Sequence, residues 1–192
     1  MKKIKEAPDS VRNNLNLLIC NFDMLEQRLS DYDCQIKDLA ESDKYKKRVK
    51  ALTCFRGLDY LSAMTLVCEI GDVKRFAHPK NLVSYAGMDI SEYSSGGKER
   101  KYRITKMGNR YIRTSVIEAN QRFDLPPQVS RHLKRRRESC EQMHIEIADR
   151  CMMRLYKKAT SLKHKTKPHN KIKVACGREM LGFVWEALMK VA

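Results

Sequence analysis

The sequence lacks the short motifs that mark common metal, redox and membrane sites. Its seven cysteines form no C-x-x-C pair, its five histidines form no H-x-x-x-H pair, and no cluster of four acids is present to hold two divalent ions. It has no run of about 18 apolar residues, and its first residues show no apolar segment of signal-peptide length. We therefore expect buried, reduced thiols and a cytoplasmic protein that binds no metal by itself and does not enter a membrane.

Acidic residues are scarce relative to basic ones. The 192 residues include 39 Lys and Arg against 23 Asp and Glu, a formal net charge of +16. This excess indicates a polyanionic partner, either nucleic acid or an anionic membrane surface, and the alternative is a surface that only promotes solubility. The basic stretches are not paired with an exposed Trp, Phe and Leu face, which favours nucleic acid.

Apolar residues in the first segment recur at alternating intervals of four and three. This spacing is typical of a coiled coil, because it keeps one narrow apolar stripe against a partner helix. We expect residues 1–50 to form a heptad helix that joins protomers through residues 11–39 into a homo-oligomer, either dimer or tetramer. The alternative is an amphipathic helix lying on its own domain. The stripe consists of Val11, Leu15, Leu18, Phe22, Leu25, Leu29, Tyr32, Ile36 and Leu39.

The positive charge is concentrated after this helix. Residues 1–50 carry 11 basic and 9 acidic side chains, which leaves 28 basic and 14 acidic side chains, a balance of +14, for residues 51–192. The anion-binding surface is therefore expected in the second segment.

Glycine and proline divide the second segment into short helices. Asp59 is placed to cap a helix that Gly71 ends, and Pro79 begins a helix that ends at Gly87. Gly57 precedes the first of them and suggests a helix-hairpin-helix-like element, in which backbone N–H groups face a DNA phosphate. The alternative is that this glycine only permits a tight turn.

Three further apolar patterns at helical spacing complete the segment, over residues 112–123, 129–155 and 174–188. No alternating strand of convincing length is present, although a strand over residues 102–105 is left open. The predicted fold is all-α, mostly helical, with a compact domain over residues 51–192.

The most unusual stretch is YSSGGKERKYRITKMGNRY, residues 93–111, within a predicted basic loop over residues 91–110. Gly96 and Gly97 would let consecutive backbone N–H groups form a nest for an oxyanion. The G-x-x-x-x-G-K-[ST] spacing of a Walker loop is missing, and no His or carboxylate is obviously placed to activate a serine. Composition alone favours a nucleic-acid-contacting loop over a catalytic one. The basic residues of this loop are Lys98, Arg100, Lys101, Arg103, Lys106 and Arg110.

Two more cationic tracts follow, over residues 131–137 and 163–173. In the first, we expect Arg131, Lys134 and Arg135 to contact nucleic acid. Phosphate contacts of this kind give affinity and salt dependence but little reading of sequence.

Four sequence blocks follow one another over about residues 50–190. They are FRGLDYLSAMTLVCEIGDVKRFAHPKNLVSYAGM, SEYSSGGKERKYRITKMGNRYIR, PPQVSRHLKRRR and NKIKVACGREMLGFVWEALM. Together they resemble the C-terminal domain of the bridge-RNA-guided insertion-sequence transposases, the insertion sequence one-ten family (IS116/IS110/IS902 type). The block Y-S-S-G-G-K…R-I-T-K-x-G-N-R-Y is the most specific of the four.

The resemblance implies a domain whose serine attacks a DNA phosphodiester and forms a covalent phosphoserine link. Ser95, directly before the first glycine, matches the nucleophile best, and Ser94 is the alternative. Family members also carry a RuvC-like domain with four acidic metal ligands, and the two domains build composite sites across an oligomer around DNA and a guide RNA. The same motif includes Lys98, Arg103, Lys106, Gly108 and Asn109.

Two positions depart from the family pattern. Ile90 stands where the family usually has proline, and Tyr102 stands at a glycine position, where it would crowd the backbone. The sequence shows no RuvC-like set of acids, so we expect no DNA cleavage by this chain alone and a role for Mg²⁺ only with an acidic partner domain. Guide-RNA binding by this chain is left open. The rival hypothesis is a non-catalytic nucleic-acid-binding or assembly protein.

Overall fold

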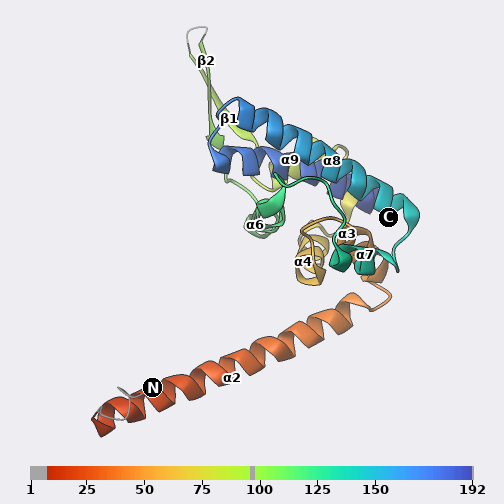
Figure 1. Cartoon of the computed structure of the whole chain (residues 1–192). Coiled ribbons are helices and arrows are strands. Elements are labelled where there is room, and N and C mark those ends of the chain that lie inside the picture. The colour runs from red at the N-terminus through yellow and green to blue at the C-terminus, as the bar shows by residue number, and fades with distance from the viewer. Residues whose placement is uncertain (1–7, 96–97, 192) are drawn as a thin grey trace. The chain divides into compact units, whose positions relative to one another are not determined.

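The computed structural model describes residues 8–95 and 98–191, and for the part of residues 92–102 within these ranges it describes the backbone alone (Figure 1). Backbone contacts divide the chain into two units, Met1–Leu39 and Ala40–Ala192. The predicted boundary at residue 50 differs from this division, because helix α3 (Lys46–Thr53) packs within the second unit.

The first unit is the helix α2 (Asp9–Ala40), which continues without interruption. Its sequence contains neither glycine nor proline, so nothing in the interior removes a backbone hydrogen bond. Most apolar side chains of the predicted stripe are exposed, among them Phe22 and Leu29. The prediction of a helix over residues 11–39 is confirmed, and the coiled coil stays a prediction.

The second unit is a set of helices around one central helix. Helix α9 (His169–Met189) packs against four others and is buried on several faces, as expected of a helix that is apolar nearly all round. Its neighbours in the core are α3, α5 (Pro79–Tyr85), α6 (Arg110–Ala119) and α8 (Gln142–His164). Helix α4 (Tyr60–Ile70) packs on α3 and α6. The prediction of a mostly helical fold is confirmed.

The helix ends of α4 and α5 lie where glycine, proline and capping residues predict them. Asp59 accepts a hydrogen bond from the backbone N–H of Ser62 at 2.8 Å. Gly71 and Gly87 follow the two helices with left-handed φ angles of 63° and 64°.

The single helix predicted over residues 129–155 is wrong, because the chain breaks there into α7 (Arg131–Arg137) and α8. Ser130 caps α7 by accepting from the N–H of Leu133 at 3.2 Å. The helix ends where Arg137 turns its side chain inward and donates from Nε to the carbonyl oxygen of Cys54 at 3.0 Å. A tertiary hydrogen bond therefore marks a boundary that apolar periodicity does not show.

The predicted basic loop is instead largely a β-hairpin. Strands β1 (Ile90–Ser95) and β2 (Lys98–Ile104) pair antiparallel, and they form the sheet of the described residues. Their register runs from Ile90 opposite Ile104 to Ser95 opposite Lys98. In β2, Tyr102 and Ile104 alternate with Arg103, which fits a pleated ribbon, but this alternation is too short to stand out in a basic sequence.

The predicted burial of the cysteines holds for only part of the set. All seven thiols are free, and burial raises the pKa of Cys176 to about 12. Cys20, Cys34 and Cys68 are exposed instead. Among the residues that the structure describes, no helix is long and apolar enough to cross a membrane.

Ion pairs join the surface of α8 to that of α9. Glu179 accepts from Nε of Arg154 at 2.9 Å, and its other oxygen lies 3.2 Å from Nζ of Lys158. The hydrogen bond from Arg154 lowers the pKa of the Glu179 carboxyl below its ordinary value of 4.5. The carboxylate therefore stabilises the fold above that value, and this contribution is lost as the pH falls through the lowered pKa.

Replacing Glu179 with glutamine is expected to reduce the free energy of unfolding at pH 7 by about 0.5–1 kcal/mol, since such pairs are screened by solvent. The difference from the unsubstituted protein should shrink as the pH falls below about 4.5. Urea unfolding followed by circular dichroism over a pH series measures it. Glu26→Gln, at an exposed carboxylate on α2, is the control and should change little. A loss at Glu179 that persists unchanged at the acid end would contradict the ion-pair explanation.

Candidate nucleic-acid interface

The chain leaving β2 is held tightly against the loop that follows α5. The backbone N–H of Thr105 donates to the carbonyl oxygen of Asp89 at 2.8 Å, and that of Lys106 donates to Gly87 at 2.9 Å. Lys106 has a left-handed φ of 56°, which redirects the chain from β2 toward α6. We call residues 103–111 the hairpin base, because these hydrogen bonds fix the end of the hairpin that joins it to the helical unit.

Gly108 and Asn109 complete the turn into α6. A Cβ on Gly108 would lie 2.4 Å from the carbonyl oxygen of Tyr85, so this close approach requires glycine. Asn109 caps α6 by accepting from the N–H of Ile112 at 3.0 Å, and its Nδ2 donates to the Glu69 carboxylate at 2.6 Å. The Asn109 side chain is therefore engaged within the fold, and its contact with nucleic acid stays a prediction.

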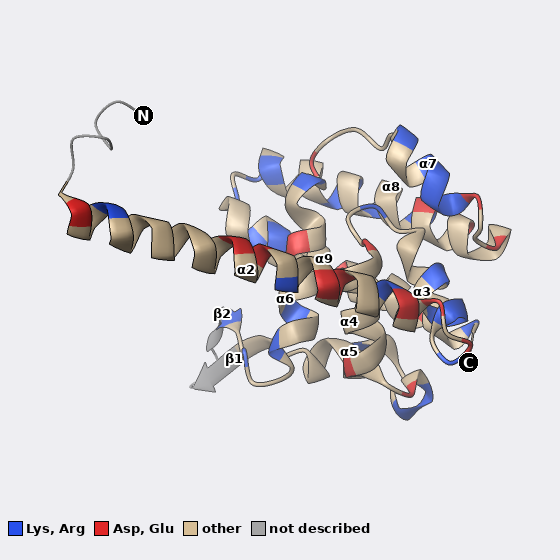
Figure 2. Ribbon diagram, turned by 90° about the horizontal axis from the view of Figure 1, so that it is seen from below, with Lys and Arg blue, Asp and Glu red and all other residues tan. Residues whose placement is uncertain are grey.

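The exposed polar side chains of the hairpin base include three of the predicted nucleic-acid contacts. Arg103, Lys106 and Arg110 are all exposed. Within the described part of the chain, none of them forms a salt bridge with an acidic side chain. Figure 2 shows basic residues on β2 and at the start of α6. Cations without an internal partner are available to neutralise phosphates.

The other end of the hairpin carries the serines. The backbone of Ser94 pairs with Glu99, and that of Ser95 pairs with Lys98. Four predicted site residues have side chains outside the described part of the structure, namely Ser94, Ser95, Lys98 and Arg100. The roles assigned to them stay predictions, and the predicted nest at residues 96–97 also lies outside the described residues.

The basic run of residues 131–137 separates into an exposed and an inward face. The three residues predicted to contact nucleic acid are exposed, namely Arg131, Lys134 and Arg135. Arg136 instead donates to the carbonyl oxygen of Leu58, and Arg137 lies 2.8 Å from the Asp149 carboxylate. Two of the charges in this run therefore tie α7 to the helical unit, and the other three face solvent.

Three arginines that are distant in the sequence line one groove beside α7. Arg56, Arg122 and Arg136 border a hollow of about 600 Å³, in which Glu118 is the acidic lining residue. Burial, and secondarily the charge of Arg122, lowers the pKa of Arg56. Sequence reasoning missed this cluster, because no local spacing connects the three positions.

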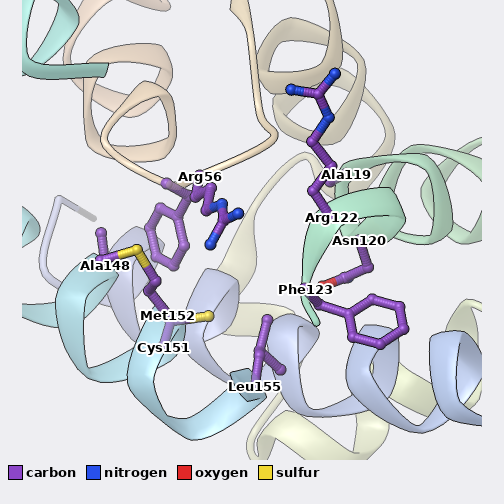
Figure 3. Close-up of a pocket in the computed structure, with 10 residues that line it drawn as sticks. Arg56, Ala119, Asn120, Arg122, Phe123, Ala148, Cys151, Met152 and Leu155 are labelled. Atoms are coloured by element: carbon purple, nitrogen blue, oxygen red, sulfur yellow. The ribbon is translucent and has the colours of Figure 1, made fainter. Parts of the chain in front are cut away.

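One cavity of the helical unit is too small to hold a substrate. Its volume is about 20 Å³, and its lining includes Phe123, Met152 and Leu155 (Figure 3). A cavity needs roughly 10–15 Å³ of such volume for one water molecule. No group of three or more His, Cys, Asp or Glu side chains that could hold a metal ion occurs among the described residues. The features that suggest function are therefore on the surface.

Comparisons with known proteins find similarity to transposases. Residues 49–124 match the family model described as the transposase IS116/IS110/IS902 family. A putative transposase, y4qE, from Sinorhizobium fredii is 33% identical over 71% of this chain and 35% of its own length. The transposase of insertion sequence element IS1533 from Leptospira borgpetersenii is 30% identical over 80% of this chain and 49% of its own length.

A third relative, the transposase of insertion sequence element IS1111A from Coxiella burnetii, is 29% identical over 54% of this chain and 28% of its own length. The chain thus spans between about a quarter and a half of these curated relatives. The matched residues run from within α3 through α6 and include the β-hairpin with its base. The chain therefore carries a transposase region of the IS116/IS110/IS902 family.

Proposed function

We propose that the helical unit binds DNA and takes part in transposition, with Ser95 as the nucleophile and Ser94 as the alternative. The observation that carries this proposal is the hairpin itself. Its register puts Ser95 opposite Lys98 at one end. At the other end stands the fixed hairpin base, whose exposed cations Arg103, Lys106 and Arg110 form no salt bridge among the described side chains. DNA phosphates held by the base would lie along the ribbon that ends in the serines.

The proposed reaction is a phosphoryl transfer. The serine Oγ attacks a backbone phosphorus, an O–P bond forms, and the P–O bond to a deoxyribose oxygen breaks. The serine proton passes to solvent, and the leaving oxygen takes a proton from water to become a free hydroxyl. The product is a phosphoserine ester that a DNA hydroxyl can later attack, which restores the serine and joins new strands. Positive charge around the phosphate would stabilise the transition state.

The proposal uses no metal held by the described residues, because they offer no group of ligands that fits one. Family resemblance implies that Mg²⁺ and its acids belong to a RuvC-like domain. We propose that such a domain completes the site, and that α2 brings protomers together through its heptad stripe. A guide RNA is a further proposed partner of the assembled enzyme.

The test is the formation of a covalent protein–DNA adduct. The chain would be mixed with an acid-bearing RuvC-like domain, Mg²⁺, guide RNA and donor DNA, and adducts would be resolved on denaturing gels. Ser95→Ala is expected to abolish the adduct, and Ser94→Ala to leave most of it. Ser91→Ala is the matched control, since the Ser91 hydroxyl donates to the carbonyl oxygen of Arg103 at 2.8 Å within the hairpin.

Three outcomes would change the proposal. An adduct that survives Ser95→Ala and is lost with Ser94→Ala moves the nucleophile by one residue. An adduct formed without the acidic domain removes the proposed dependence on a partner. DNA binding with no adduct under any of these conditions supports the non-catalytic alternative instead.

A further inference from the structure

Two large apolar side chains stand out on the hairpin base, and the proposed function leaves them unused. Met107 is 84% exposed and Tyr111 is 62% exposed. Among the described residues, Met107 is the most exposed of the large apolar side chains. Single exposed apolar residues are common, but two on one short, rigid segment call for an explanation.

The backbone around this pair is fixed on both sides. Before Met107, the N–H of Lys106 donates to Gly87; after it, the N–H of Asn109 donates to the carbonyl oxygen of Tyr85 at 2.7 Å. Tyr111 lies in the first turn of α6, which Asn109 caps. The two apolar side chains are therefore presented to solvent from an ordered backbone, so binding through them would cost little further ordering of the chain.

The charge around the pair identifies the class of partner. Met107 directly follows Lys106, and Tyr111 directly follows Arg110. Both cations are exposed and lack a salt bridge within the described ranges. A partner for this surface must offer negative charge beside an apolar face. Nucleic acid has both, in its phosphates and in the faces of its bases.

We propose that Met107 and Tyr111 contact DNA bases directly: Met107 inserts as a wedge at a base step, and Tyr111 stacks on a base that the distortion exposes. Apolar wedges of this kind unstack neighbouring base pairs and kink the duplex. An aromatic ring stacks on any base, because every base has a π-face. The inference rests on the proposed DNA binding. It adds a means of opening the duplex next to the hairpin that carries the serines.

The experiment measures binding of the full chain to a DNA duplex of random sequence and to the same duplex with an unpaired stretch at its centre. Affinities are taken over a series of salt concentrations, and 2-aminopurine placed in the DNA reports unstacking. Tyr111→Ala is expected to weaken binding by roughly 5- to 150-fold, as for the loss of one stacked base. The slope of log affinity against log salt should not change, because no phosphate contact is removed.

Three further variants and one control variant separate the effects. Met107→Ala should abolish the 2-aminopurine signal on the closed duplex and lose much less affinity on the DNA that is already unpaired. Tyr111→Phe should bind as the unsubstituted protein does. Arg110→Ala should instead reduce the salt slope by about 0.9. Met153→Ala, at a methionine that is 43% exposed on α8, is the control and should have no effect.

The failure of this inference can be told apart from the failure of the proposed function. If the unsubstituted chain binds DNA and both Met107→Ala and Tyr111→Ala match it, the base contacts are refuted and DNA binding stands. The same holds if these variants change only self-association measured by sedimentation, which would assign the pair to a protein contact. If the unsubstituted chain binds neither the closed duplex nor the duplex with the unpaired stretch, the base contacts and the proposed DNA binding are both refuted.

Discussion

Replacing Gly57 with alanine is expected to lower the free energy of unfolding by about 3 kcal/mol or more, among the largest effects of one methyl group in this protein. Gly57 has a left-handed φ of 89°, and a Cβ there would lie 2.1 Å from the carbonyl oxygen of Ala119. The obstacle is backbone at the end of α6, so neither side can give way by a change of rotamer. The free-energy costs of the strained φ and of the backbone clash therefore add.

Two other glycines separate these two causes. Gly71 has a φ of 63° and a ψ of −121°, with nothing within 4 Å of a Cβ, so Gly71→Ala should cost about 1–3 kcal/mol from backbone strain alone. Gly182 lies within α9 with open space around it, so Gly182→Ala should stabilise the protein by roughly 0.5–1 kcal/mol. Urea unfolding of the three variants gives the ranking. Equal losses of the free energy of unfolding at Gly57 and Gly71 would show that the backbone at the end of α6 moves to accommodate the Cβ at position 57.

This geometry also bears on the two interpretations of Gly57. A glycine at a helix-hairpin-helix turn binds DNA if its backbone N–H faces a phosphate. It is required for packing if its Cα lies against protein. The direction in which its Cβ would point is occupied by Ala119. Packing alone is therefore enough to require glycine here, and Arg56 beside it carries charge into the groove next to α7.

Replacing Arg137 with alanine is expected to lower the free energy of unfolding by about 2–4 kcal/mol. Its side chain is 8% exposed, its Nε donates to Cys54 at 3.0 Å, and its Nη1 lies 2.8 Å from the Asp149 carboxylate. Removal leaves the Cys54 carbonyl without its donor and opens space between α7, α3 and α8. Thermal and urea unfolding followed by circular dichroism measure the loss.

Arg135→Ala is the matched control, because it removes the same charge from the same short helix. Arg135 is exposed, so its loss should change stability by less than about 0.5 kcal/mol. In DNA binding the order should reverse under conditions where both variants are folded: Arg135→Ala should reduce the salt slope, and Arg137→Ala should not. A weaker salt slope for Arg137→Ala in folded protein would refute the division of this run into an exposed and an inward face.

Local sequence signals were enough to predict most of the helices and the family. Asp59 and Pro79 start α4 and α5, because capping and a preset φ act within one turn of the chain. The apolar residues of α9 predict a buried helix without any knowledge of its neighbours. The ordered blocks around the Ser-Ser-Gly-Gly motif carry family membership in the same way, since they are read directly from the chain.

The candidate site was predicted only in part. The basic residues of the hairpin base could be named from the sequence, because charge is visible there. The β-hairpin on which they lie could not be predicted, since its strand pattern is short and weaker than the helical patterns on either side. Nor does the sequence indicate that Asn109 is tied to Glu69, a contact across 40 positions. The exposure of Met107 and Tyr111 follows from that anchored turn rather than from their neighbours in the chain.

The sequence by itself determined the helical class, the heptad helix, the excess of positive charge and the transposase family, because each depends on composition or on spacing within a few turns. Only the tertiary structure decided which charges face outward. Arg135 is exposed while Arg137 is buried, and Arg56, Arg122 and Arg136 meet at one groove. The physical reason is that a charged side chain is buried only where distant backbone and carboxylate groups converge to satisfy it, and that convergence exists only once the helices have packed.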